Sequence, residues 1–169
     1  MKPSDHLRGL TQEALISILF YDQNTGLFTW LKNTGRAHKG DVAGKPHPCG
    51  YVLIGIKGRH YLAHRLAWFY VYGEWPVEID HINLIKNDNR IGNLRTATRT
   101  QNNMNRLSSK HSTSGCKGAS LDRRDGKSDA RIRMNGKTYY LGRFSAPEDA
   151  TKAYHAAAKK LCGEFARVA

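Results

Sequence analysis

Cysteine is scarce in this chain of 169 residues, and the spacing of its three copies excludes a cysteine-based zinc site. Cys49, Cys116 and Cys162 lie far apart and form no Cys-x-x-Cys pair, the spacing that such zinc sites use. Because the cysteines are also odd in number, we interpret them as reduced thiols.

Long apolar segments are missing as well. No stretch contains the ~18 uninterrupted apolar residues that a membrane span needs. The first ten residues, MKPSDHLRGL, lack the apolar core of a signal peptide. We therefore expect a soluble, cytoplasmic protein without a membrane partner.

Acidic residues are few compared with basic ones. The chain has 14 Asp and Glu against 27 Lys and Arg, a formal charge of +13 and a pI of about 9.9. The net charge is +3 over residues 1–79, +3 over 80–107 and +7 over 108–169. The positive charge is therefore not confined to one basic tail. Such a charge attracts a polyanion by releasing its counterions. Nucleic acid is the leading partner, and a basic protein without a nucleic-acid role is the alternative.

Local patterns in the first part of the chain predict a helix and a hairpin. Thr11 is a suitable N-cap for a helix that runs to about Phe20. Two short strands, 51–56 and 60–63, flank the turn-forming pair Lys57-Gly58. We expect these strands to pair as a hairpin.

The segment 64–72 is rich in large apolar residues and predicts a buried helix that ends at Gly73. His64 belongs to this apolar segment. We interpret His64 as a structural residue rather than a ligand.

Residues 76–106 contain few apolar side chains but many asparagines, so a metal or a nucleic acid would have to order them. Thr98 and Gln101 form a capping box that predicts a helix carrying Asn102 in its first turn. Most of the asparagines, Asn89 among them, are expected to be ordinary turn residues.

Four residues of this stretch could carry chemistry together. Asp80 and His81 are adjacent, and on a strand their side chains point to opposite sides of the backbone. Asn93 follows Asp80 by 13 residues, and Asn102 follows Asn93 by nine. An Asp-His pair alone would be more consistent with a surface turn that happens to contain a histidine. With both asparagines in register, we predict a site where Asp80 holds a cation and His81 handles a proton.

These residues resemble the HNH endonucleases, specifically the phage and intron-encoded subgroup in which Asn replaces the last His. The family's Asp-His pair, Asn-Leu pair and helical Asn correspond to Asp80-His81, Asn93-Leu94 and Asn102.

The resemblance extends upstream to the lead-in runs G-x-F-T-W at 26–30 and A-H-R-L-A-W at 63–68. It implies an α+β fold with a ββα-metal nuclease domain over residues 1–107 and its core motif at 78–106.

The resemblance also implies a role for each site residue. His81 would be the general base, because a neutral imidazole accepts a proton near pH 7, and Asn93 would orient that imidazole. Asp80 and Asn102 offer oxygen ligands only, which suits Mg²⁺ or Mn²⁺. Three arginines could hold flanking phosphates: Arg90, Arg95 and Arg106.

A second module is expected after a polar linker at 108–114. Strands at 130–134 and 137–141 flank Asn135-Gly136, a typical tight hairpin turn. This turn would pair Arg131 with Tyr140 and Arg133 with Thr138 on one face. Ser145 and Glu148 form a capping box for the helix that follows.

Residues 115–169 resemble an AP2-type DNA-binding domain, through the runs Y-L-G-R-F and A-x-K-A-Y-x-A-A-A and the ending G-E-F-A-R. The resemblance implies a small three-stranded sheet plus a helix. Ser128 stands where that family has Trp, which would weaken packing or DNA affinity. The residues implied to contact DNA are Arg123, Arg131, Arg133 and Tyr140. A merely solvated hairpin face is the alternative.

We therefore predict a metal-dependent endonuclease acting on double-stranded DNA, of the phage homing type, working in the cytoplasm of a bacterial host without an obligatory protein partner. One alternative is a DNA-binding regulator with a catalytically inactive HNH-derived fold. It would be distinguished by whether the four site residues converge around a cation-sized site. The other is an RNA-binding protein, which competition between duplex DNA and RNA would distinguish.

Overall fold

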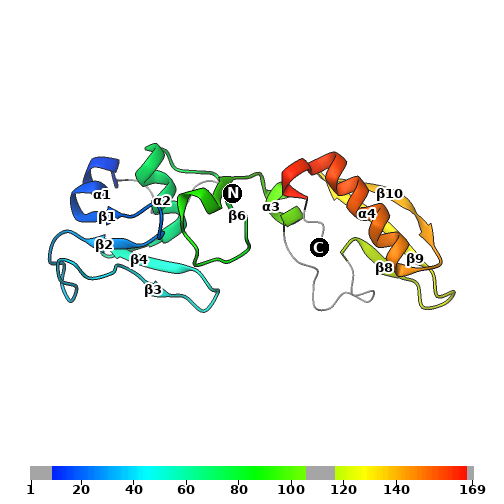
Figure 1. The fold of residues 1–169 in the computed structure, drawn as a ribbon, viewed down its shortest axis with the longest axis horizontal. Helices are drawn as coiled ribbons and strands as arrows, with labels where there is room; N and C mark the ends of the chain where they lie inside the picture. Colours follow the sequence, from blue (N-terminus) through cyan, green and yellow to red (C-terminus); the bar gives the residue numbers. More distant parts are fainter. Residues whose placement is uncertain (1–8, 106–116, 167–169) are drawn as a thin grey trace. The chain divides into compact units, whose positions relative to one another are not determined.

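The computed structural model describes residues 9–105 and 117–166 (Figure 1). They form two compact units that divide between Ala97 and Thr98. Both units combine helices with antiparallel strands, which confirms the mixed α+β class. Arg106 and the predicted linker at 108–114 lie outside the described residues, so the domain limits at 107 and 115 stay predictions. In the described part of the chain, no helix has the length and apolar character that a membrane span requires.

Over residues 9–97 the first unit contains three small antiparallel sheets, β1-β2, β3-β4-β5 and β6-β7, together with two α-helices and a 3-10 turn. In chain order its elements are α1 (Gln12–Ile18), β1 (Leu19–Tyr21), β2 (Phe28–Trp30), β3 (Lys45–Pro46), β4 (Val52–Ile56), β5 (Arg59–Leu62), α2 (Ala63–Tyr72), β6 (Ile79–His81), η2 (Ile91–Asn93) and β7 (Leu94–Thr96).

Helix α1 begins where the sequence predicts and ends earlier. The Thr11 side chain accepts a hydrogen bond from the backbone N–H of Ala14 at 3.2 Å, which confirms the N-cap. The predicted continuation to about Phe20 is wrong, because the chain turns into β1 at Leu19. Leu19 and Tyr21 are buried and pair with β2, and this sheet pairing outweighs the local helical pattern.

The β4-β5 hairpin and helix α2 confirm the sequence-based prediction. Lys57 and Gly58 both have positive φ values, 47° and 75°, as a two-residue turn of this kind requires. Helix α2 ends at Gly73, whose φ of 73° is left-handed and whose N–H donates to the Phe69 carbonyl at 2.9 Å.

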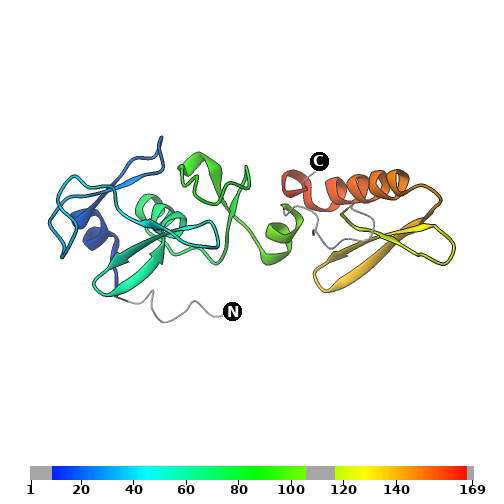
Figure 2. The same ribbon diagram turned by 90° about the horizontal axis from the view of Figure 1, so that it is seen from below.

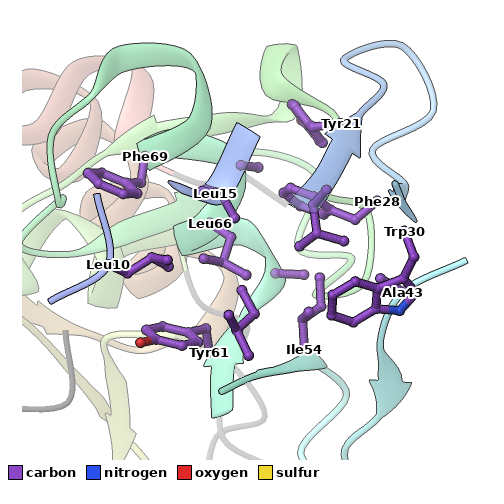
Figure 3. Close-up of a cluster of buried hydrophobic side chains, with 14 of the residues drawn as sticks. Leu10, Leu15, Tyr21, Phe28, Trp30, Ala43, Ile54, Tyr61, Leu66 and Phe69 are labelled. Carbon is purple, nitrogen blue, oxygen red and sulfur yellow. The ribbon is translucent and has the colours of Figure 1, made fainter. Parts of the chain in front are cut away.

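One hydrophobic cluster holds the first unit together (Figure 3). Its fully buried members come from separate elements, and each such side chain stabilises the fold by about 1.5–3 kcal/mol. They include Leu15, Phe28, Ile54 and Leu66. The cluster also contains Ile79 of β6 and Leu94 of β7, so it anchors the hairpin that carries Asp80 and His81.

The second unit is a three-stranded antiparallel sheet with one long helix packed on it. Figure 2 shows helix α4 lying along this sheet, and α4 contacts all three strands. Its elements are α3 (Arg99–Asn105), β8 (Ala119–Leu121), β9 (Ser128–Met134), β10 (Lys137–Phe144), α4 (Pro147–Cys162) and η3 (Gly163–Phe165), with strand order β10-β9-β8.

The β9-β10 hairpin has the predicted turn and register. Tyr140 pairs with Arg131 and Thr138 with Arg133, and a bulge then shifts the register between Tyr140 and Gly142. The predicted capping box of Ser145 and Glu148 is wrong. Helix α4 starts at Pro147 after Ala146, with no side-chain cap, because a proline needs no hydrogen-bond partner at the first helical position.

Candidate active site

The hairpin of β6 and β7 positions the residues with predicted chemistry. Asp80 and His81 lie on β6, where all three residues are buried. The register pairs Asp80 with Arg95 and His81 with Leu94. Because Leu94 belongs to the hydrophobic core, the backbone at His81 is held by both the strand pairing and the core.

Arg95 compensates the charge of the buried Asp80. Its Nε and Nη2 atoms donate to the same carboxylate oxygen, Oδ2 of Asp80, at 2.9 and 2.8 Å. The Asp80 side chain is only 3% exposed and that of Arg95 14%. A carboxylate at this depth requires an opposite charge close by. The contact of Arg95 with a DNA phosphate stays a prediction, while in this structure its guanidinium binds Asp80.

Asn93 closes the loop that joins β6 to β7. Its side-chain oxygen accepts from the backbone N–H of Asn83 at 3.1 Å, and its Nδ2 donates to the backbone carbonyl of Asp88 at 2.8 Å. The backbone carbonyl of Asn93 accepts from Ile82 N–H at 3.0 Å. These bonds tie both ends of the loop together. The role of Asn93 in orienting His81 stays a prediction.

An ion pair stiffens the same loop at its surface. Arg90 donates from Nε and Nη2 to the two oxygens of Asp88 at 2.8 and 2.6 Å, and Asn83 donates to Asp88 at 2.6 Å. Chiefly the Arg90 hydrogen bonds lower the pKa of Asp88 to about 2. Arg90 is exposed, and its predicted phosphate contact is untested.

The end of β1 and the turn that follows it contact the loop between β6 and β7, although they lie far from it in the sequence. The Tyr21 hydroxyl donates to the backbone carbonyl of Asn89 at 2.6 Å. Gly26 has a φ of 74°, and a Cβ there would lie 2.5 Å from the Arg90 nitrogen. Only glycine fits this approach. Sequence reasoning missed these contacts, although the G-x-F-T-W run that begins at Gly26 was a signal for them.

His81 has the electrostatic character of a base. Burial lowers its pKa, because the charged imidazole loses solvation there. The Asn89 side chain and the carboxylates of Asp80 and Asp88 act in the opposite direction, and Lys86 lowers the pKa further. A histidine with a lowered pKa is uncharged at neutral pH, so it can accept a proton.

Two aromatic side chains lie against the His81 imidazole. The His64 ring meets it edge to face, with centroids 5.0 Å apart and planes at 78°. The Tyr51 ring lies 6.0 Å from His81 and 5.1 Å from His64. The Lys86 ammonium lies 5.0 Å from the Tyr51 ring centroid and donates to the Cys49 carbonyl at 2.9 Å. The sequence-based interpretation of His64 did not include this contact.

Asn102 lies on α3, which belongs to the second unit. The predicted capping box is confirmed: Thr98 N–H donates to Gln101 Oε1 at 2.7 Å, and Gln101 N–H donates to Thr98 Oγ1 at 3.2 Å. Helix α3 packs through Met104, whose sulfur accepts from the Tyr154 hydroxyl at 3.5 Å. The metal-binding role of Asn102 stays a prediction.

The predicted DNA-contacting residues of the second unit are exposed, and two of them share an acidic neighbour. Asp129 accepts from Arg131 Nη2 at 2.9 Å and from the Tyr140 hydroxyl at 3.5 Å. The Arg131 guanidinium lies 5.9 Å from the Tyr140 ring centroid. Arg133 and Arg123 are also exposed. The DNA contacts of all four stay predictions.

Asp80 contributes one buried carboxylate to the candidate site. Residues 9–105 and 117–166 contain no group of three or more His, Cys, Asp or Glu that could hold a metal ion. Asp80 offers one buried carboxylate, so the remaining ligands would be amide, water or phosphate oxygens. Mg²⁺ in particular keeps several waters and binds through one or two carboxylates and substrate phosphates.

A comparison with known families matches the part of the chain that contains this site. Residues 61–104 match a family model described as HNH endonuclease. The matched segment covers His64, Asp80, His81, Asn93 and Asn102. The match supports the HNH family for this segment and a nuclease that acts on DNA. A search of curated proteins found no match.

Proposed function

We propose that the protein is a metal-dependent HNH endonuclease that hydrolyses phosphodiester bonds in double-stranded DNA. One observation carries the proposal: His81 is buried next to the buried Asp80 carboxylate, on the hairpin that the HNH family model covers. The hairpin is held by the core and by Asn93, so both side chains are fixed before substrate binds.

His81 acts as the general base in this proposal. Its imidazole takes a proton from a water molecule, whose oxygen attacks the phosphorus while the bond to the 3′ oxygen breaks. The leaving 3′ oxygen takes up a proton from solvent water, so the products carry a 5′ phosphate and a 3′ hydroxyl. A positioned base of this kind typically contributes ~10²–10⁴-fold in rate.

Asp80 and Asn102 would hold Mg²⁺ or Mn²⁺. Such an ion, when bound, polarises the scissile phosphate and stabilises the leaving 3′ oxygen. In the absence of the ion, Arg95 supplies the compensating positive charge at Asp80.

The second unit would supply DNA binding. Its antiparallel sheet presents Arg131, Arg133 and Tyr140 on an exposed hairpin face, which is consistent with a β-ribbon reader of the AP2 type. A nuclease joined to such a module is consistent with a phage homing enzyme.

A catalytically inactive DNA-binding regulator is the second candidate. The observation that favours it is the hydrogen bond and ion pair by which Arg95 already binds Oδ2 of Asp80. In a regulator that pair would persist in the presence of Mg²⁺, whereas in a nuclease the ion would share the carboxylate.

Cleavage of a plasmid library with random inserts tests the proposal. The full chain should cut with Mg²⁺ or Mn²⁺ and stop in EDTA. His81→Ala should lose cleavage and keep DNA binding, because it removes the base and no phosphate contact. His38→Ala, which changes an exposed histidine outside the site, is the matched control. Wild-type turnover by His81→Ala would exclude His81 as the base, and a full chain that binds DNA without cutting in either metal would favour the regulator.

A further inference from the structure

We propose that His64 is a positioning residue for His81: its buried ring packs against the imidazole of the base and fixes the plane in which that base meets its water. The inference deepens the proposed nuclease function and rests on it. It changes the sequence-based interpretation of His64, which gave this residue a role in packing alone.

The contact joins parts of the chain that are rigid for separate reasons. His64 is the second residue of α2, and α2 places Leu66 and Phe69 in the hydrophobic core. His81 lies on β6, whose backbone is paired with β7. The edge-to-face geometry at 5.0 Å and 78° is within the range that aromatic rings favour. The imidazole of His81 therefore packs against a side chain whose backbone is held in place by helix α2.

Tyr51 completes the enclosure. Its ring lies beside both histidines, and the Lys86 side chain lies over the ring and close to Gly50. Tyr51 directly precedes β4, while His64 lies on α2 and His81 on β6. Rotation of the His81 ring away from its present plane would have to displace His64 or Tyr51.

The chemistry of His64 agrees with a positioning role. His64 is only 6% exposed, and burial lowers its pKa to about 3, so it adds no charge beside the base near neutral pH. Its buried Nδ1 has no hydrogen-bond partner among the described residues. At that atom the imidazole adds nothing to the stability of the fold, because an unpaired buried polar atom is destabilising. The interactions of its ring are the contacts with His81 and Tyr51, the other two rings of this enclosure.

A matched set of variants separates positioning from packing. His64→Leu keeps most of the volume and removes the flat ring, whereas His64→Phe keeps a ring and removes the nitrogens. Tyr61→Ala is the control for general damage to the core. Tyr61 is buried in the same hydrophobic cluster, and its ring stacks on Trp75, with centroids 6.0 Å apart.

The first readout is NMR of the histidine rings in the metal-free full chain. Wild type should show cross-relaxation between the rings of His64 and His81. In His64→Leu the His81 ring signals should shift and broaden, while Tyr61→Ala should leave them unchanged. Unaltered His81 signals in His64→Leu would overturn the proposal. This readout does not depend on cleavage, so an inactive wild type would refute the proposed function and leave this test intact.

The second readout is the steady-state kinetics of DNA cleavage. A displacement of about 1 Å can cost on the order of 100-fold in rate, so His64→Leu should lose about 10- to 100-fold in kcat with little change in KM. The kcat of His64→Phe should stay within about threefold of wild type, because phenylalanine keeps the ring contact that positions His81 for the chemical step. Tyr61→Ala should retain kcat per folded molecule. Equal kcat losses in His64→Leu and His64→Phe, or a KM effect alone, would refute the role of the ring.

Discussion

Replacing Arg95 by alanine would leave the Asp80 carboxylate buried without the charge that now compensates it. The two guanidinium nitrogens lie 2.9 and 2.8 Å from Oδ2 of Asp80. At the shorter distance, an effective dielectric constant of about 20 gives an attraction of about 6 kcal/mol. Removing one partner of a buried pair typically costs about 3–5 kcal/mol. We expect Arg95→Ala to lower the free energy of unfolding of the first unit by that amount.

Urea unfolding followed by tryptophan fluorescence measures this change in the first unit alone, because the three tryptophans, Trp30, Trp68 and Trp75, all precede Ala97. Arg90→Ala is the matched control. The Arg90 side chain is 53% exposed and pairs with Asp88 at the surface, so its removal should cost far less stability than the removal of Arg95. If Arg95→Ala costs no more than Arg90→Ala, the pair with Asp80 does not stabilise the hairpin as argued.

Titration with Mg²⁺ extends the test to the metal. An ion that binds the folded state at 100 times its Kd adds about 2.7 kcal/mol of stability. The gain should be larger in Arg95→Ala than in wild type, since Asp80 then has no competing guanidinium. Equal gains in both proteins, or none in either, would speak against Asp80 as a metal ligand.

Three further predictions concern pH, packing and DNA binding. The pKa of His64 is about 3 when folded and about 6.5 when unfolded, so the unfolded state binds the extra proton between those values. The stability of the first unit should therefore fall as the pH is lowered through this window, and less steeply in His64→Phe; parallel curves from urea unfolding would contradict this. Ser128→Ala removes a buried hydroxyl that has no partner among the described residues, so hydrogen exchange of the β9 amides should show unchanged stability or a gain of up to about 1 kcal/mol. A clear loss there would mean that the hydroxyl is bonded. Replacing Arg131 and Arg133 together by alanine should flatten the slope of log affinity against log salt by roughly two units if both contact phosphates. Fluorescence anisotropy with duplex DNA measures that slope, and an unchanged slope and affinity would show a merely solvated face.

Local chemistry determined a large part of this fold. The turns at Lys57-Gly58 and Asn135-Gly136 need left-handed backbone, and the residues there adopt it, so both hairpins and the pairing of Arg131 with Tyr140 follow from the sequence. The capping box of Thr98 and Gln101 likewise depends on residues three apart. Patterns that need only neighbouring residues can be predicted because the interaction energy lies within one turn of chain.

Tertiary structure decided the rest. The α1 helix ended early because Leu19 and Tyr21 found partners in β2. In the candidate site, the spacing of Asp80, His81 and Asn93 predicted the chemistry, and the roles of these residues stay predictions. Residues 61–104, which contain them, match the HNH endonuclease family model.

The spacing did not predict which other side chains the site residues contact. The pairing of Arg95 with Asp80, the support of Asn89 by Tyr21 and the packing of His64 against His81 all join separate segments. Such contacts depend on how strands and helices meet around a shared core. A periodic pattern records which face of an element is buried, but it does not record which side chain of another element it will face.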